Sequence, residues 1–244
     1  MTTTTWFADW FDSAYYHLLY NNRNEAEAQE FMRNLLAHLN LDKGSRLLDL
    51  ACGKGRHSIY LHSQGYEVLG VDLAAESIAA ASEQAKEGLS FAVHDMREPL
   101  NMGQFDAVFN LFTSFGYFES EEEHLQTLKE IRNMLPKDGF FVLDFMNAHK
   151  VIQNLVLAEE KQVKDVLFHL RRYVENGYIV KDIRFEAEGQ NFNFQERVRG
   201  FLLADFQALF AQAGLEILAQ FGNYQLAPFS EESSNRLILI AKAC

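Results

Sequence analysis

The sequence has few cysteines, and acidic residues outnumber basic ones. The two cysteines, Cys52 and Cys244, have no metal-ligand spacing around them, and the eight histidines include no His-x-x-x-His pair, so no metal site is expected. Cys52 lies inside a glycine loop, which disfavours a disulfide to Cys244. The formal net charge is −12. Proteins that bind phosphate backbones or anionic membranes usually present a basic face, so nucleic-acid and membrane partners are disfavoured.

Long apolar runs are absent as well. No run reaches the length that spans a bilayer, and the first residues lack the basic-then-apolar layout of a signal peptide. We therefore expect a cytoplasmic protein. With 244 residues, 48% of them hydrophobic, the chain can bury a large core.

From Arg46 onward, short apolar runs alternate with helical stretches. This alternation predicts a parallel sheet with helices on both faces, and short apolar strands are typical of strands covered on both sides. The predicted strands are residues 46–50, 67–72, 90–94, 105–111 and 140–145. The predicted helices between them lie near residues 56–64, 75–87 and 121–135.

Two segments depart from this α/β rhythm. Residues 6–20 and 25–39 read as two helices before the first strand. Residues 163–174 and 178–186 flank Asn176-Gly177, a strong hairpin signal, and 192–201 continues as a third extended piece. The rhythm resumes with a helix at 203–213 and strands at 215–221 and 236–242. We predict one domain over residues 1–244, made of a helical cap (1–40), an α/β core (41–150 and 201–244) and a small antiparallel β insertion (151–200).

A glycine loop follows the first strand. Gly53 and Gly55 allow a tight turn, and the next helix presents free N–H groups and a positive dipole end. Asp72 ends the second strand, where a carboxylate can accept hydrogen bonds from ribose hydroxyls, and Asp95 follows the third. Signals at the carboxyl ends of three successive strands indicate a nucleoside ligand. Two other interpretations stay open: Asp72 as a helix N-cap, and Asp95 as a solvent-exposed loop acid.

Two residues bear on which nucleoside cofactor is bound. The dinucleotide fingerprint has a third glycine where this chain has Ser58. Asp49, four residues before Gly53, can approach a cationic amino-acid moiety, whereas a pyrophosphate gains nothing from a carboxylate there. The charges favour S-adenosylmethionine (SAM) over a nicotinamide cofactor, and an NAD(P)-dependent oxidoreductase is the less favoured enzyme.

Several motifs together resemble those of class I SAM-dependent methyltransferases of the small-molecule type. They are Leu48-Asp49-Leu50-Ala51-Cys52-Gly53-Lys54-Gly55, Val71-Asp72, Asp95-Met96, Phe105-Asp106-Ala107-Val108-Phe109-Asn110 and Pro136-Lys137-Asp138-Gly139-Phe140. The resemblance implies a Rossmann-like α/β fold with a seven-stranded, mostly parallel sheet, whose last strand is antiparallel, and with helices on both faces. It also implies SAM as the cofactor. The implied and inferred cofactor-binding residues are Tyr16, Tyr20, Asp49, Ala51, Gly53, Gly55, Arg56, His57, Asp72, Leu73, Asp95, Met96, Asn110 and Leu111.

The methyl acceptor is less defined by the sequence. Leu111-Phe112 after Asn110 departs from the form found in enzymes that methylate nucleic-acid amino groups, which favours a small-molecule acceptor. Residues 112–118 either line the acceptor pocket or pack in the core, and the insertion either caps the active site or forms a dimer contact. The sequence assigns no catalytic residue; the candidate bases are Tyr16, Tyr20, Tyr117 and His149. A protein that senses SAM without transferring its methyl group is the alternative function, and the oligomeric state is not assigned.

Overall fold

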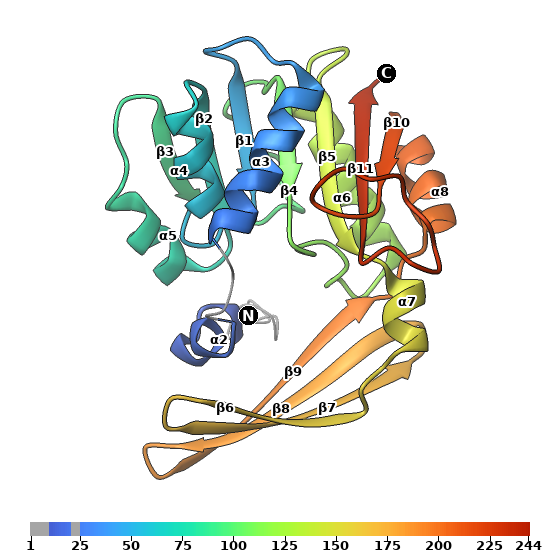
Figure 1. The fold of residues 1–244 in the computed structure, drawn as a ribbon. Coiled ribbons are helices and arrows are strands. Elements are labelled where there is room, and N and C mark those ends of the chain that lie inside the picture. Colours follow the sequence, from blue (N-terminus) through green and yellow to red (C-terminus); the bar gives the residue numbers. More distant parts are fainter. Residues whose placement is uncertain (1–9, 21–24) are drawn as a thin grey trace.

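The computed structural model describes residues 10–20 and 25–244. Figure 1 shows two layers of different kind: a large sheet flanked by helices, and a second, smaller sheet below it. The helices are α2 (Ala14–Leu19), α3 (Glu25–Leu39), α4 (Arg56–Ser63), α5 (Ala75–Ser82), α6 (Glu121–Asn133), α7 (Ala148–Gln153) and α8 (Leu203–Ala213). The strands are β1 (Arg46–Leu50), β2 (Glu67–Asp72), β3 (Leu89–Val93), β4 (Ala107–Asn110), β5 (Phe140–Met146), β6 (Ala158–Val163), β7 (Val166–Glu175), β8 (Tyr178–Ala187), β9 (Gln190–Arg199), β10 (Leu215–Phe221) and β11 (Arg236–Ala243).

The large sheet has seven strands in the order β10-β11-β5-β4-β1-β2-β3. Strands β1 to β5 pair in parallel, and β11 runs antiparallel to both β5 and β10. The chain order reverses beside β1, between β4 and β2. In open α/β sheets ligands bind at the carboxyl ends of the strands next to such a switch point. The predicted Rossmann-like fold, with its antiparallel last strand, is confirmed.

Helices cover the large sheet on both faces, because successive strand residues point to opposite sides. Leu47 of β1 packs in a cluster with Phe31 and Leu35 of α3. Its neighbour Leu48 packs in the other cluster, with residues of α6 and α8 such as Ile131. Both layers are needed to bury these strands, which explains why the strands read as continuous apolar runs.

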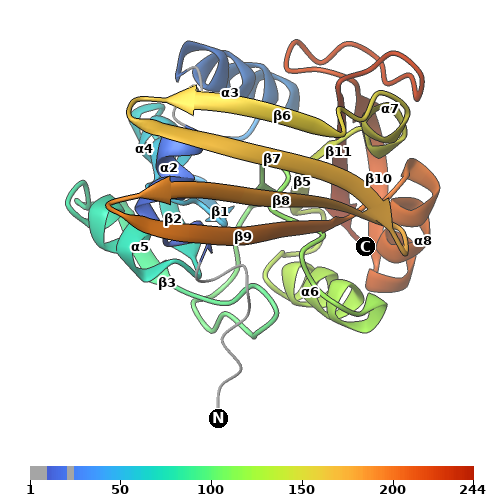
Figure 2. The ribbon, with the colours of Figure 1, turned by 90° about the horizontal axis from the view of Figure 1, so that it is seen from below.

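The smaller sheet is the insertion predicted after the fifth strand. Its strands β6-β7-β8-β9 are antiparallel throughout and lie across the carboxyl-end side of the large sheet (Figure 2). Helix α2 packs on its inner face, where Trp10 and Leu19 join Phe168, Ile183 and Phe185 in one buried cluster. Within the described ranges, no helix has the length and apolar character that crossing a membrane requires.

Several predicted boundaries are wrong. The strand expected over residues 163–174 is two strands, because Lys164, with φ of 50°, turns the chain between β6 and β7. Helix α5 ends at Ser82 instead of residue 87, and the short helix α7 was not predicted. Of the helix expected over residues 6–20, positions 6–9 lie outside the described residues, and α2 accounts for only part of the rest.

Candidate active site

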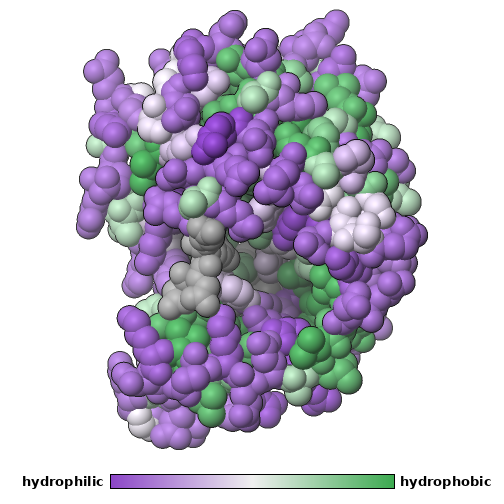
Figure 3. Space-filling view, viewed as in Figure 1, coloured by the Kyte–Doolittle hydropathy of each residue, from purple (hydrophilic) through white to green (hydrophobic). Residues whose placement is uncertain are grey.

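A cavity of about 690 Å³ lies between the carboxyl ends of the large sheet and the inner face of the insertion sheet. The hollow is visible from outside in Figure 3, between the upper and lower parts of the molecule. All the predicted cofactor-binding residues except Gly55 and Asn110 line it. Their contacts with SAM stay a prediction, but the fold brings them to one place.

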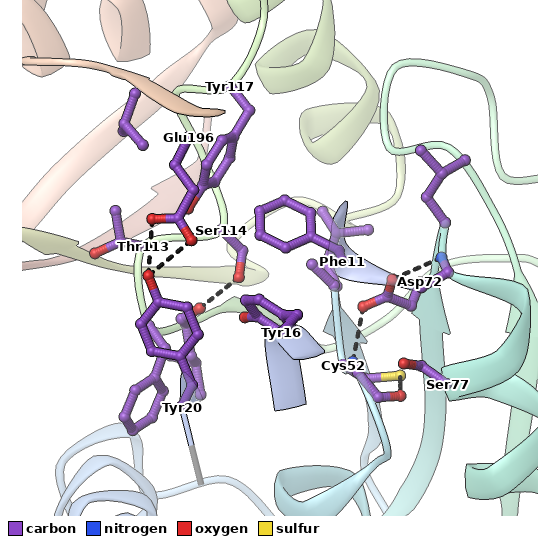
Figure 4. A pocket seen from close by; sticks show the side chains of 18 of the residues that line it. Phe11, Tyr16, Tyr20, Cys52, Asp72, Ser77, Thr113, Ser114, Tyr117 and Glu196 are labelled. Carbon is purple, nitrogen blue, oxygen red and sulfur yellow. Dashed lines mark hydrogen bonds between the residues drawn. The ribbon is translucent and has the colours of Figure 1, made fainter. Parts of the chain in front are cut away.

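The glycine loop is held by the carboxylate of Asp72. Gly53 N–H donates to Asp72 Oδ2 at 2.7 Å, and Ala74 N–H donates to Oδ1 at 2.9 Å. Burial raises the pKa of Asp72, although these hydrogen bonds act against the shift. The side chain thus binds the backbone at the start of α5 and also fixes the loop, while it still lines the cavity (Figure 4).

Asp49 lies fully inside the fold at the cavity wall. Ser58 Oγ donates to its Oδ2 at 2.6 Å, and burial raises the pKa of Asp49 to about 6. Ser58 fits where a glycine would allow close packing because Gly70 lies opposite: a Cβ on Gly70 would come within 2.8 Å of Ser58 Oγ. Ser58, which replaces the third glycine of the dinucleotide fingerprint, therefore holds the carboxylate that the SAM interpretation requires.

Gly55 and Asn110 lie behind the cavity wall. Gly55 is the N-cap of α4, and a Cβ there would be 2.5 Å from the Phe91 ring. Asn110 is buried, and its Nδ2 donates to the carbonyl oxygen of Leu50 at 3.1 Å. These residues support the wall instead of lining it.

Asp95 is held in an ion-pair network. Burial acts to raise its pKa, but hydrogen bonds and charge from Arg97 outweigh this, so the pKa of Asp95 lies below its ordinary value. Arg97 Nη2 lies 2.7 Å from Asp95 Oδ2, and its Nη1 lies 2.7 Å from Glu123 Oε1 at the start of α6. The carboxylate is therefore paired with Arg97 instead of being a free loop acid, and with Met96 it lines the cavity.

The loop after β4 has two consecutive non-glycine residues with positive φ, Phe112 at 58° and Thr113 at 61°. Asp144 of β5 accepts the N–H of Phe112 with its carboxylate and the N–H of Thr113 with its carbonyl. Arg236 of β11 pairs with Asp144 Oδ1 at 2.7 Å and donates to Thr113 Oγ1 at 3.0 Å. A buried ion pair thus holds a strained turn at the cavity edge.

Residues 112–118 divide between the two predicted roles, lining the cavity and packing in the core. Phe112, Thr113, Ser114, Tyr117 and Phe118 line the cavity. Phe115, fully buried, belongs to the core. Phe112 stacks against His57 at 5.0 Å and under the Arg56 guanidinium at 4.4 Å, which joins this loop to the start of α4.

The insertion sheet contributes a polar group that the sequence interpretation missed. Glu196 of β9 accepts hydrogen bonds of 2.7 Å from Trp10 Nε1 and from the Tyr20 hydroxyl. Lys181 of β8 donates to the Tyr20 oxygen at 2.7 Å. Figure 4 shows Tyr20 and Glu196 facing each other across from Asp72. Burial and the neighbouring carboxylate raise the pKa of Tyr20 well above its ordinary value, so it stays a phenol.

The candidate bases are only partly brought together. Tyr16, Tyr20 and Tyr117 line the cavity, whereas His149 does not. His149 lies on α7, 2.7 Å from Gln153 Nε2 and 3.7 Å from Glu231. The structure therefore does not support His149 as a candidate base, because its side chain does not line the cavity.

Comparisons with known proteins agree with this geometry. A family model described as a methyltransferase domain matches residues 47–139. The putative methyltransferase YqeM of Bacillus subtilis is 34% identical over 116 residues, which are 46% of this chain and 47% of that protein, so the match spans about half of its length. The glycine/sarcosine N-methyltransferase of Aphanothece halophytica is 29% identical over 233 residues, which are 90% of this chain and 83% of that protein.

A solved structure has the same fold: a SAM-dependent methyltransferase from Clostridium acetobutylicum, with a TM-score of 0.79 and 20% identity, covering 94% of this chain and 96% of that one. The matched domain, the strand-end motifs and this fold are those of class I SAM-dependent methyltransferases. The chain thus contains a methyltransferase domain, and SAM is the cofactor of solved structures with this fold.

The residues at the cavity fit SAM. A Cβ at Gly53 would meet nothing within 4 Å, so the loop backbone is open for a ligand to lie against. Two carboxylates, the buried Asp49 and the partly buried Asp72, line the cavity. SAM carries a sulfonium, an ammonium and a ribose diol, which are the groups that carboxylates bind.

Proposed function

We propose that the protein transfers the methyl group of SAM to the nitrogen of a small polar amine. The observation that carries this is one cavity lined from two sides. The side of the large sheet presents Asp49, Gly53 and Asp72, and the side of the insertion sheet presents Lys181 and Glu196. Its volume of about 690 Å³ is within the range of small-molecule sites, roughly 300–1,000 Å³.

Nitrogen as the acceptor atom is supported by a relative that matches 90% of the chain and is named glycine/sarcosine N-methyltransferase. It is also supported by the polar lining opposite the cofactor side, since an amine needs hydrogen-bond acceptors such as Glu196.

Bound SAM supplies an electrophilic methyl group on a good leaving group. The acceptor's nitrogen lone pair forms the new bond to the methyl carbon while the carbon–sulfur bond breaks. The sulfur keeps the electron pair of that bond as S-adenosylhomocysteine forms, and the nitrogen then loses a proton to water. The chain's own contribution is to hold the two molecules in line and to exclude bulk water. In this proposal Asp49 and Asp72 hold the cofactor side, and residues 111–114 with the insertion sheet hold the acceptor side.

The insertion is thus proposed as the cap of the active site instead of a dimer contact. Residues 1–244 are proposed as one domain, with α2 packed on the inner face of the insertion. A cytoplasmic location and the absence of nucleic-acid and membrane partners stay predictions from the sequence.

The test is transfer of labelled methyl from SAM to a panel of small amines, alcohols and thiols. We expect an N-methylated product and an equal amount of S-adenosylhomocysteine. Label found only on oxygen or sulfur would contradict the proposal, as would binding of SAM without transfer to any acceptor, the behaviour of a SAM sensor.

A further inference from the structure

Three charged residues form a row across the inner face of the insertion sheet. Arg172 of β7 lies opposite Lys181 of β8, and Lys181 lies opposite Glu196 of β9. All three line the cavity. Along the same three strands their neighbours on this face are apolar: Leu170, Ile179, Ile183, Phe194 and Val198. On the edge strand β6, Glu159 accepts a hydrogen bond of 2.7 Å from Arg172 Nη2. A row of charged side chains that lines the cavity, on a largely apolar face, indicates a binding site for a polar ligand.

The arrangement of charges in the row is unfavourable without a ligand. Like charges directly opposite each other on neighbouring strands destabilise a sheet, and Arg172 and Lys181 are such a pair. Burial lowers the pKa of Lys181, and the charges of Arg172 and Lys161 lower it further, against the opposing effect of Glu196. Arg172, Lys181 and Lys161 therefore place three positive charges around one interior carboxylate, that of Glu196. The other acid near Arg172, Glu159, is 43% exposed, so water screens that pair.

The contacts of Lys181 leave room for an anion. Its Nζ donates to the Tyr20 oxygen at 2.7 Å and lies 3.6 Å from Glu196 Oε2, which is longer than a hydrogen bond. An ammonium group has three donors, so Lys181 can also donate to a ligand in the cavity that it lines.

We propose that Arg172 and Lys181 bind a carboxylate of the methyl acceptor, so that the acceptor is an amino acid with its nitrogen on the Glu196 side of the row. Neighbouring strands are about 4.8 Å apart, which matches the few ångströms between the carboxylate and the nitrogen of a small amino acid. This assignment rests on the proposed function, in which nitrogen receives the methyl group.

The row also has a structural role, because Trp10 and Tyr20 bind Glu196 and so attach α2 to the insertion sheet. Lys161 of β6 separates the two roles. Its Nζ donates to the carbonyl oxygen of Leu19 at 2.8 Å, which also holds α2, but Lys161 does not line the cavity. If Lys181→Met acted only by loosening α2, Lys161→Met should cause the same loss of activity.

The experiment compares wild type with Lys181→Met, Arg172→Met, Arg172→Lys and the control Lys161→Met. Initial rates are measured with sarcosine and the standard amino acids, and with glycinamide and glucosamine, which are amines without a carboxylate. Titration with S-adenosylhomocysteine and circular dichroism show that each variant folds and binds the cofactor product.

We expect turnover of at least one amino acid and little turnover of glycinamide or glucosamine, which have no carboxylate. Lys181→Met and Arg172→Met should raise the KM for that amino acid about tenfold or more, the scale of a lost charged hydrogen bond. Arg172→Lys should recover part of the loss. In the Arg172 variants the affinity for S-adenosylhomocysteine should stay within about twofold of wild type, because Arg172 contacts none of the predicted cofactor-binding residues. Lys161→Met should leave the KM for the amino acid near the wild-type value.

Two outcomes overturn the assignment while N-methylation stands: equal turnover of glycinamide or glucosamine, with or without turnover of amino acids, or equal KM values for Lys181→Met and Lys161→Met. Methyl transfer only to oxygen or sulfur would instead overturn the proposed function itself, and this assignment with it.

Discussion

Ser58 Oγ lies 2.6 Å from Asp49 Oδ2, and both residues are buried at the base of the glycine loop. The hydroxyl occupies the place where a dinucleotide-binding loop has its third glycine. It gives a buried carboxylate a hydrogen-bond partner next to the cavity. The same substitution that removes the dinucleotide fingerprint therefore supports a site for a cationic ligand.

Because Asp49 is buried, its charged carboxylate should lower the stability of the fold while it favours the binding of SAM. Its pKa is raised from 3.8 to about 6, so the folded chain holds the proton more tightly than the unfolded chain, and stability falls as the pH rises between these values. Asp49→Asn should flatten this part of the pH profile and raise the free energy of unfolding at neutral pH by up to about 3 kcal/mol. Its affinity for SAM should fall at least about tenfold, because the amide carries no charge.

Urea unfolding across this pH range and calorimetric titration with SAM measure the two effects. In the wild type, SAM affinity should fall as the pH drops below about 6, where Asp49 takes up its proton. An unchanged affinity in Asp49→Asn would mean that the carboxylate serves only the loop.

Removing the Asp72 carboxylate should weaken SAM binding sharply while the fold survives. Asp72→Ala loses the hydrogen bonds from Gly53 and Ala74, at a cost of about 1–2 kcal/mol of stability, the scale of a lost helix cap. The affinity for SAM should fall well over tenfold, since the ribose contact and the loop geometry are lost together. Asp165→Ala, which removes an exposed acid in the β6–β7 turn, is the charge control and should bind SAM as wild type does. Equal calorimetric affinities for the two variants would remove Asp72 from the site.

Arg236 should act as a positioning residue for the loop after β4. Arg236→Met leaves Asp144 buried without its cation and should cost about 3–5 kcal/mol of stability. Because Asp144 also holds Phe112 and Thr113, kcat should fall more than the affinity for SAM does. Lys242→Met, on the same strand, breaks only solvent-exposed pairs and should cost no more than about 1 kcal/mol. Thermal unfolding and steady-state kinetics together test this, and equal losses in both variants would contradict it.

The large sheet and its motifs could be predicted because each rests on a local signal. Gly53, Asp72 and Asp95 stand at the ends of successive apolar runs, and parallel strands bring such ends together. The hairpin at Asn176-Gly177 was visible for the same reason, since the turn chemistry is contained in two residues.

The acceptor side could not be predicted from local signals, because it depends on register between strands. Arg172, Lys181 and Glu196 become neighbours only once β7, β8 and β9 pair. A weak signal did exist: Glu196 stands in phase with Phe192, Phe194 and Val198, so period-two alternation places a carboxylate on the apolar face. The Asp144–Arg236 pair likewise joins two strands 92 residues apart in sequence.

The most direct test of the central claim is calorimetric titration of the protein with SAM and S-adenosylhomocysteine, with NAD and NADP as controls. We predict that SAM and S-adenosylhomocysteine bind one site per chain and that neither nicotinamide cofactor binds. Binding of NAD or NADP without binding of SAM would contradict the account.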